Sequence, residues 1–353
     1  MSHNESPNEG TTVKNEEYRF EAEEFFPRAV FEAITEVRVN DPDAILREAQ
    51  RLCKRPTLTL DGRLVIVATD HPGRRVTALR EDPLRMGNRH EYLSRALRVL
   101  TAPGCDGIMG TPDFMEEILI VSHLIRQSRQ ETFLDNKVLV GCMNRGGFAG
   151  VLGEIDDRFT AFSAEELSRL RFDGGKMMYR LTPSDERTIK SISDCAQAVT
   201  DLHRKGLYSF LEPLHMLQQA DGGYKQVTDS ETLIKDVGAT AALGESASKT
   251  WLKLPYSDDY HRVAEATTLP ILMLGGPAQD TPEPTLRNFA SGMKTASNVR
   301  GVMVGRNVTF VAREDPRAVA AAVGTIVHDG ASAQEAMDLM HSERSREMDL
   351  LQT

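Results

Sequence analysis

Short apolar runs and longer amphipathic stretches alternate along the chain from about residue 60 to residue 330. The intervening stretches, such as 113–127, 184–205 and 315–330, carry apolar residues at helical spacing. The apolar runs have the length of buried strands. They occupy residues 64–69, 104–110, 137–143, 175–181, 207–213, 250–255, 270–276 and 300–305. Eight strands with helices between them predict an α/β fold, and eight repeats of this unit fit a single (β/α)8 TIM barrel.

An open, doubly wound sheet is the competing architecture. Such a sheet ordinarily carries a G-x-G-x-x-G turn after its first strand, and the sequence here is "ATDHPGRR", so we prefer the barrel. The helical pattern also extends upstream of the first strand, with apolar residues at helical spacing in "DPDAILREAQRLCKR". The expected organisation is a disordered tail (1–18), a helical extension (19–60), the barrel (61–330) and a C-terminal helix (331–353).

Composition narrows the classes of function. The 353 residues carry a formal net charge of −10, which argues against nucleic acid as a partner. No apolar stretch approaches the ~18 residues of a spanning helix, and the N-terminus lacks the pattern of a signal peptide, so we expect no membrane partner and a cytoplasmic location. The four cysteines are widely spaced and nine histidines form no H-E-x-x-H or H-x-H motif. We therefore expect no metal and no cofactor.

Ionisable residues fall on the predicted strands near the rim of the barrel, the end where parallel strands finish and barrels carry catalytic groups. They are Asp70, Lys176, Glu212 and Lys253. Lys176 comes early in its strand, so only its long side chain would bring the ammonium group to the rim. A structural ion pair between Lys176 and Glu212 is the alternative interpretation, and Asp70 with His71 can instead cap a turn.

Lys253 stands in an apolar strand, "TWLKLP", where desolvation lowers the pKa of an ammonium group. A second cation nearby, such as Lys176, would lower it further, and the neutral amine can then attack a ketone to form a Schiff base. The imine is an electron sink that permits cleavage of the neighbouring carbon–carbon bond. Glu212 is the candidate general acid and base, with a pKa that burial would raise. An edge-strand lysine that discourages aggregation is the simpler interpretation, but a closed barrel has no edge.

The runs 270–276 and 300–305 both lead into glycine, and barrels often bind phosphate with the loops after their last two strands. Gly275, Gly276 and Gly305 let backbone N–H groups approach phosphate oxygens, and Arg306 can add a charge-assisted hydrogen bond. The alternative interpretation is that these glycines only end strands at turns. A nucleophilic serine is unsupported, since no G-x-S-x-G occurs.

Several of these runs resemble the class I, Schiff-base aldolases of the DhnA and LacD type. The resemblance covers about residues 60 to 312 and rests on "VIVATDHPG", "GGKMMYRL", "YSFLEPL", "WLKLPYSDD", "LPILMLGGP" and "GVMVGRNV". The motifs "GGKMMYRL" and "YSFLEPL" are similar to strands of tagatose-bisphosphate and sulfofructose-phosphate aldolases. The resemblance implies a Schiff base on Lys253, acid–base work by Glu212, support from Lys176 and Asp70, and a ketose phosphate cleaved to dihydroxyacetone phosphate. It also implies a homo-oligomer.

Two segments, "HPGRR" and "NRGGFAG", depart from the family pattern and bring in Arg74, Arg75 and Arg145. With Arg180 they would place positive charge opposite the phosphate loops, which suits a substrate with an anionic group at both ends. Arg145 is the preferred candidate, since Arg74 and Arg75 are equally well interpreted as solvated or helix-capping. With its long N-terminal extension, the chain resembles a branch of this family that is associated with inositol breakdown. In that pathway 2-deoxy-5-keto-gluconate 6-phosphate is cleaved to dihydroxyacetone phosphate and malonate semialdehyde.

Two other functions remain open on the same barrel. One is a deoxyribose-phosphate-type aldolase or an acyl-transferring relative, which the choice between aldehyde and ketone donors would separate. The other is a non-catalytic barrel that has kept its phosphate loops and binds a ligand without converting it.

Overall fold

The structure is a computed structural model that describes residues 18–144, 155–220 and 222–351. All eight predicted strands form. They are β1 (Leu64–Ala68), β2 (Gly107–Gly110), β3 (Val138–Cys142), β4 (Gly174–Leu181), β5 (Tyr208–Gln218), β7 (Thr250–Leu254), β8 (Ile271–Leu274) and β9 (Val299–Val304). Each pairs in parallel with its neighbours in the order β4-β3-β2-β1-β9-β8-β7-β5, and β4 pairs with β5 to close the ring. The predicted TIM barrel is confirmed.

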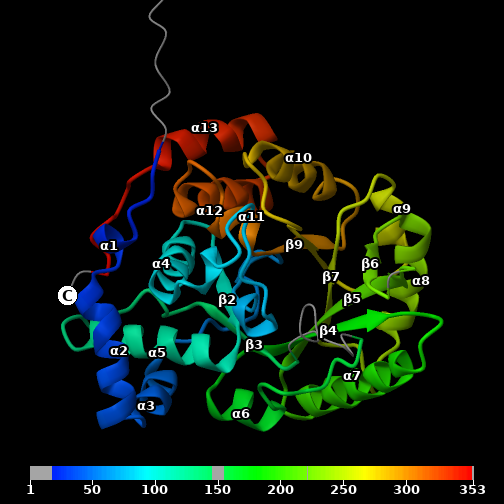
Figure 1. The fold of residues 1–353 in the computed structure, drawn as a ribbon, viewed down its shortest axis with the longest axis horizontal. Helices are drawn as coiled ribbons and strands as arrows, with labels where there is room; N and C mark the ends of the chain where they lie inside the picture. The colour runs from blue at the N-terminus through cyan, green and yellow to red at the C-terminus, as the bar shows by residue number, and fades with distance from the viewer. Residues whose placement is uncertain (1–17, 145–154, 221, 352–353) are drawn as a thin grey trace, which may run out of the picture.

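Helices surround the barrel between consecutive strands, as Figure 1 shows. The longer ones are α4 (Arg89–Leu100), α5 (Pro112–Arg126), α6 (Ala164–Arg169), α7 (Arg187–Arg204), α8 (Ser230–Ala241), α9 (Tyr260–Glu265), α10 (Glu283–Gly292) and α12 (Pro316–Gly324). The four-residue helix α11 (Arg306–Thr309) follows β9 directly. Several begin at a side-chain cap: in α8 the Asp229 carboxylate accepts a hydrogen bond from the backbone N–H of Thr232 at 3.0 Å.

Helices also lie at both ends of the described chain. Before the barrel come α1 (Ala22–Phe25), α2 (Arg28–Asn40) and α3 (Ala44–Arg51), and after it comes α13 (Ala333–Glu343). In Figure 1, α2 and α3 lie beside α5, and α13 lies beside α10 and α12. The Glu48 carboxylate of α3 is fully buried against α5 and accepts hydrogen bonds from Ser122 and Arg126 at 2.6 and 2.9 Å. The helical pattern predicted through residue 60 ends at Arg51. The predicted tail at 1–18 lies outside the described residues, except for Tyr18.

Every second side chain of each strand points into the barrel, and these inward side chains form layers along the barrel axis. The lower layer is apolar and includes Ile66, Val140, Phe210, Trp251 and Leu272. Two residues further along β5 and β7, the inward positions next after Phe210 and Trp251 are occupied by Glu212 and Lys253. On β4 the corresponding run is Lys176, Met178 and Arg180. Ionisable groups therefore stand directly above an apolar, packed layer near the rim.

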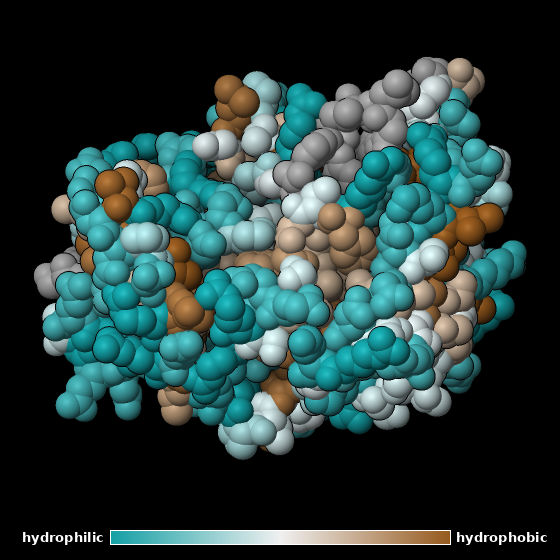
Figure 2. All heavy atoms as spheres, turned by 90° about the horizontal axis from the view of Figure 1, so that it is seen from below, coloured by the Kyte–Doolittle hydropathy of each residue, from teal (hydrophilic) through white to brown (hydrophobic). Residues whose placement is uncertain are grey.

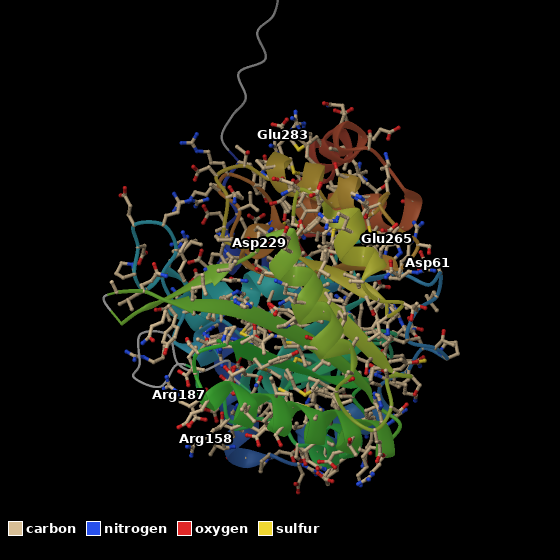
Figure 3. The ribbon with its side chains drawn as sticks, turned by 90° about the vertical axis from the view of Figure 1, so that its right-hand side faces the viewer. Asp61, Arg158, Arg187, Asp229, Glu265 and Glu283 are labelled. Carbon is tan, nitrogen blue, oxygen red and sulfur yellow. The ribbon has the colours of Figure 1, made fainter. Side chains whose placement is uncertain are left out.

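A β-hairpin that was not predicted from the sequence extends above this layer. β5 continues beyond the barrel to Gln218 and pairs antiparallel with β6 (Tyr224–Val227). Figure 3 shows the hairpin projecting on the opposite side of the molecule from the labelled Asp61, which precedes β1. Its inner side carries Leu214 and Met216, which form a small buried cluster with Ile155. The prediction ended this strand at residue 213. The end of β5, from His215 to Gln218, pairs with β6, a strand outside the barrel.

The surface is mainly polar. The face drawn in Figure 2 is largely hydrophilic, with hydrophobic side chains in small separate groups. Within residues 18–144, 155–220 and 222–351, no helix is both long and apolar enough to cross a membrane.

At the bottom of the barrel His328 joins two carboxylates. Its Nδ1 lies 2.8 Å from Asp61 Oδ2, and its Nε2 lies 3.1 Å from Asp106 Oδ2. Burial by itself would lower the pKa of His328, but the hydrogen bonds with Asp106 and Asp61 raise it to about 9. The network holds the segment before β1 against the segment before β2. The Asp106 carboxylate also accepts a hydrogen bond from the backbone N–H of Val65 at 2.8 Å.

We expect this network to make stability depend on pH in the alkaline range. The folded-state pKa of His328 is raised, so its contribution is complete below pH ~6.5, the unfolded pKa, and is lost as pH rises to about 9. The loss is about 1–2 kcal/mol, since the site is only partly shielded from solvent. Urea unfolding of the wild type and His328→Asn between pH 6 and 10 measures it. A stability gap between the two proteins that is independent of pH would contradict the assignment.

Candidate active site

Four charged side chains converge at the rim. The Lys253 ammonium group donates a 3.0 Å hydrogen bond to Glu212 Oε2, and the Lys176 Nζ lies 2.5 Å from the same oxygen. Lys176 Nζ also lies 3.4 Å from Asp70 Oδ2. Lys176 is fully buried, and Lys253 is 7% exposed. The structure therefore brings together all four ionisable residues singled out from the sequence, and the long side chain of Lys176 does reach the site.

Arg74 completes this cluster. Its Nε and Nη2 donate to Asp70 Oδ2 at 3.0 and 2.5 Å, and the side chain is almost fully buried. The interpretation of Arg74 as a solvated or helix-capping arginine is wrong, because the short helical turn at Pro72–Arg74 folds it back over the strand end. Arg75, in contrast, is exposed.

The charge state of Glu212 differs from the expectation. Burial would raise its pKa and is the largest single influence, but the charges of Lys176, Lys253 and Arg74 together lower it to about 2. The prediction of a raised pKa was wrong, because it considered desolvation and not the two ammonium groups. Glu212 is therefore ionised at neutral pH and is ready to accept a proton rather than to donate one.

Burial lowers the pKa of Lys253, and the nearby Lys176 charge lowers it further, while Glu212 and Asp70 oppose the shift. The net direction favours the neutral amine, as expected for a nucleophilic lysine. Asp70 is held ionised: burial would raise its pKa, but Arg74 and Lys176 bring it well below its ordinary value. His71 is neutral, since burial lowers its pKa to about 3.

A cavity of about 240 Å³ opens above these groups. Lys253, Glu212 and Asp70 lie in its wall, together with the predicted phosphate residues Gly275, Gly276, Gly305 and Arg306. Lys176 is not in the wall and lies beneath Glu212. The sequence-predicted groups for chemistry and for phosphate therefore share one cavity.

The loop after β8 has a shape that only glycine fits. A Cβ on Gly275 would lie 2.1 Å from the Asn307 side chain, whose Nδ2 donates to the Gly275 carbonyl at 2.7 Å. Gly276 has a φ of +74°, which side chains other than glycine rarely adopt, and has open space around it. The two glycines therefore serve the backbone turn after β8, as the interpretation of strand-ending glycines requires, and this turn lies in the cavity wall.

Other residues of the wall were not predicted. Met178, Leu214 and Gln226 contribute side chains from β4, β5 and β6. The signal for Gln226 was available in the turn "DGGY" followed by "KQV", which is typical of the return strand of a hairpin. Arg180 also lines the cavity, as proposed for a second anion. Arg145, the preferred candidate for that role, lies outside the described residues.

No group of three or more metal-ligating side chains with suitable geometry occurs in the part of the chain that the structure describes. Asp70, Arg74, Glu212 and Lys253 in the cavity wall instead form ion pairs with one another or with Lys176 beneath them.

The sequence of the barrel matches the model of a known protein family. The Cgl0159-like model aligns with residues 62–327, which spans the barrel. The chain belongs to the Cgl0159-like family. A crystal structure of Cgl0159 from Corynebacterium glutamicum is 32% identical, covers 86% of this chain and 98% of its own, and has a TM-score of 0.79.

Aldolases are also among the proteins to which this Cgl0159-like protein is similar. An uncharacterised aldolase, SSO3226 of Saccharolobus solfataricus, is 28% identical over 138 residues, and the match covers 38% of this chain and 47% of the relative, about half its length. A Schiff base-forming fructose-1,6-bisphosphate aldolase is 21% identical, covers 80% of this chain and 99% of its own, and has a TM-score of 0.54. An archaeal fructose 1,6-bisphosphate aldolase has a TM-score of 0.55 at 19% identity, covering 81% and 99%. The last two share the barrel fold.

Proposed function

We propose that this protein is a class I aldolase that cleaves a phosphorylated ketose through a Schiff base on Lys253. The observation that carries the proposal is the geometry of the buried amine. Lys253 Nζ lies in the cavity wall, 3.0 Å from an ionised carboxylate and beside a second, fully buried ammonium group. The likeness of the fold to a Schiff base-forming aldolase supports it.

In the first step the neutral amine of Lys253 attacks the ketone carbon of the substrate. The hydroxyl group of the resulting carbinolamine takes up a proton from solvent, which replaces the one that Lys253 released, and leaves as water. This gives a protonated imine, with the positive charge now on the nitrogen near Glu212. The nearby Lys176 ammonium group favours release of the proton from Lys253 before the attack.

In the second step the hydroxyl proton on the far carbon passes to Glu212. The electron pair of the carbon–carbon bond moves into the iminium to give a neutral enamine, and the aldehyde leaves. Because the positive charge next to Glu212 disappears in this step, the pKa of the carboxyl group rises as the proton arrives. The same carboxyl then returns the proton to the enamine carbon, and water hydrolyses the imine to release the ketone product.

The loops after β8 and β9 suit the phosphate of the ketone half. Gly275, Gly276 and Gly305 place backbone in the cavity wall, and Arg306 lies beside them with its Nε buried and without a hydrogen-bond partner in the described residues. A phosphate oxygen would satisfy this donor. The ketone product is then dihydroxyacetone phosphate.

For the finer substrate, we favour 2-deoxy-5-keto-gluconate 6-phosphate. Its ketone adjoins a phosphorylated carbon, and cleavage gives dihydroxyacetone phosphate and malonate semialdehyde. It carries a phosphate and a carboxylate at opposite ends, which agrees with arginines on both sides of the cavity, Arg306 and Arg180.

Trapping the Schiff base tests the proposal. Incubation with dihydroxyacetone phosphate and sodium borohydride should reduce the imine and add the mass of the ligand to the peptide that carries Lys253. The adduct should form equally well in EDTA. Activity that EDTA removes, with no adduct on any lysine, would overturn the proposed function.

A further inference from the structure

Arg180 and Gln226 lie across the cavity from the phosphate loops. Arg180 is on β4, and Gln226 is on β6, which is paired to β5. In the closed ring, β4 and β5 are neighbours, and β8 and β9 are neighbours on the other side. Three strands, β1 to β3, separate β9 from β4, and β7 separates β8 from β5. Lys253 on β7 lies between the two sides.

Arg180 is held in place at this wall. Its side chain is 8% exposed, and its Nη1 lies 3.8 Å from Asp157 Oδ2, a carboxylate that is almost completely buried. The attraction of the Asp157 carboxylate helps to hold the guanidinium group at the cavity wall. A planar guanidinium fork of this kind matches the two oxygens of a carboxylate.

The balance of charge around the cavity favours a substrate with more than one negative charge. Two arginines of the cavity wall, Arg180 and Arg306, lie on opposite sides of it. Between them Asp70 and Glu212 are paired with Arg74, Lys176 and Lys253. A cationic side chain at each end of the cavity favours a substrate with an anionic group at each end.

Between Arg180 and the reacting groups the wall is apolar. Met178 precedes Arg180 on the same inward face of β4, and Leu214 follows Glu212 on β5. A short methylene chain between the reacting carbon and the anion would lie against these two side chains. Gln226 then offers an amide N–H from the hairpin above.

We propose that Arg180, with Gln226, forms the subsite for a carboxylate on the aldehyde half of the substrate. The enzyme would accordingly select aldehydes that bear a carboxylate a short methylene chain away from the carbonyl. This inference rests on the proposed aldolase function, and the hairpin of β5 and β6 becomes the element that determines which aldehyde is accepted.

The test uses the reaction in the direction of synthesis. The purified full-length protein is given dihydroxyacetone phosphate and either succinic semialdehyde or its methyl ester, which differ in one negative charge. The ratio of kcat/KM for the acid over the ester measures the preference. We expect the wild type to favour the acid, and Arg180→Met to reduce the ratio about 30- to 100-fold. Arg180→Lys should fall in between, since it keeps the charge and loses the fork.

Gln226→Ala provides a second variant that leaves the core intact, because Gln226 is exposed. It should reduce the ratio about fivefold, the value of one hydrogen bond. Gln218→Ala is the matched control: the same residue type, exposed on the same hairpin and outside the cavity wall, should leave the ratio unchanged.

The outcomes separate this inference from the proposed function. Borohydride trapping with dihydroxyacetone phosphate alone does not involve the aldehyde half, so failure of the wild type to trap overturns the aldolase itself. Trapping by a wild type that shows no preference for the acid overturns the subsite alone. The subsite is also overturned if both Arg180→Lys and Gln226→Ala keep the wild-type ratio, whether or not Arg180→Met folds.

Discussion

Replacing Lys253 by methionine is expected to abolish carbon–carbon cleavage, with kcat falling by about 10⁴-fold or more. Without the amine no imine can form, and the carbanion that would result from bond cleavage has no electron sink. Methionine is similar in length to lysine and apolar, so the buried position above Trp251 tolerates it, and Glu212 keeps its ion pair with Lys176. Formation of dihydroxyacetone phosphate, followed through its reduction by NADH with a coupling dehydrogenase, measures the loss.

Lys249→Met is the matched control. Lys249 directly precedes β7, and its ammonium group donates to the Gly206 carbonyl at the amino-terminal end of the barrel, away from the cavity. This variant should retain full activity and full borohydride trapping at Lys253. Cleavage by Lys253→Met at more than a hundredth of the wild-type rate would show that another group carries the chemistry.

The strand pattern was sufficient to predict the barrel because parallel strands buried on both faces have the sequence pattern of short, continuous apolar runs. Every such run became a strand. The positions of Asp70, Glu212 and Lys253 at the rim then followed from the direction of the strands, since all eight finish at the same end. The chemistry of a lysine among apolar residues could therefore be predicted from the order of residues alone.

Three features depend on the three-dimensional arrangement. The bond from Lys176 to Glu212, which the sequence suggested only as an alternative interpretation, depends on the stagger of β4 against β5. This stagger sets Lys176 opposite Phe210 in register, so that its side chain must extend past one layer to reach Glu212. The pKa of Glu212 depends on how many cations surround it in space. Gln226 reaches the cavity only because β5 continues beyond the barrel and turns back.

The burial of Arg74 could also not be predicted from the sequence. An arginine in "HPGRR" next to a turn is most often solvated, and its burial follows from a pairing with Asp70 four residues earlier, at the end of β1. Local sequence shows that the two residues are close. It does not show that the turn at Pro72–Arg74 directs the guanidinium inward, toward Asp70 and Met178.

Replacing Glu212 by glutamine should separate the two steps of the reaction. The amide cannot accept the hydroxyl proton, so we expect kcat for cleavage to fall about 10²- to 10⁴-fold. Imine formation should persist. Loss of the carboxylate removes the main charge that raises the pKa of Lys253, so this pKa falls further and trapping reaches half its maximum at a lower pH than in the wild type.

Two measurements on Glu212→Gln decide whether Glu212 is a proton carrier or only a structural partner of the lysines. One is the rate of cleavage, and the other is the rate of borohydride trapping with dihydroxyacetone phosphate between pH 5 and 10. Removing one partner of a buried ion pair also costs about 3 kcal/mol of stability, so a purely structural role would reduce both rates together. Glu245→Gln, which breaks an exposed pair with Arg204, controls for charge removal alone. A large loss of cleavage with trapping retained and shifted to lower pH is the result that assigns the proton to Glu212, and equal losses would refute that role.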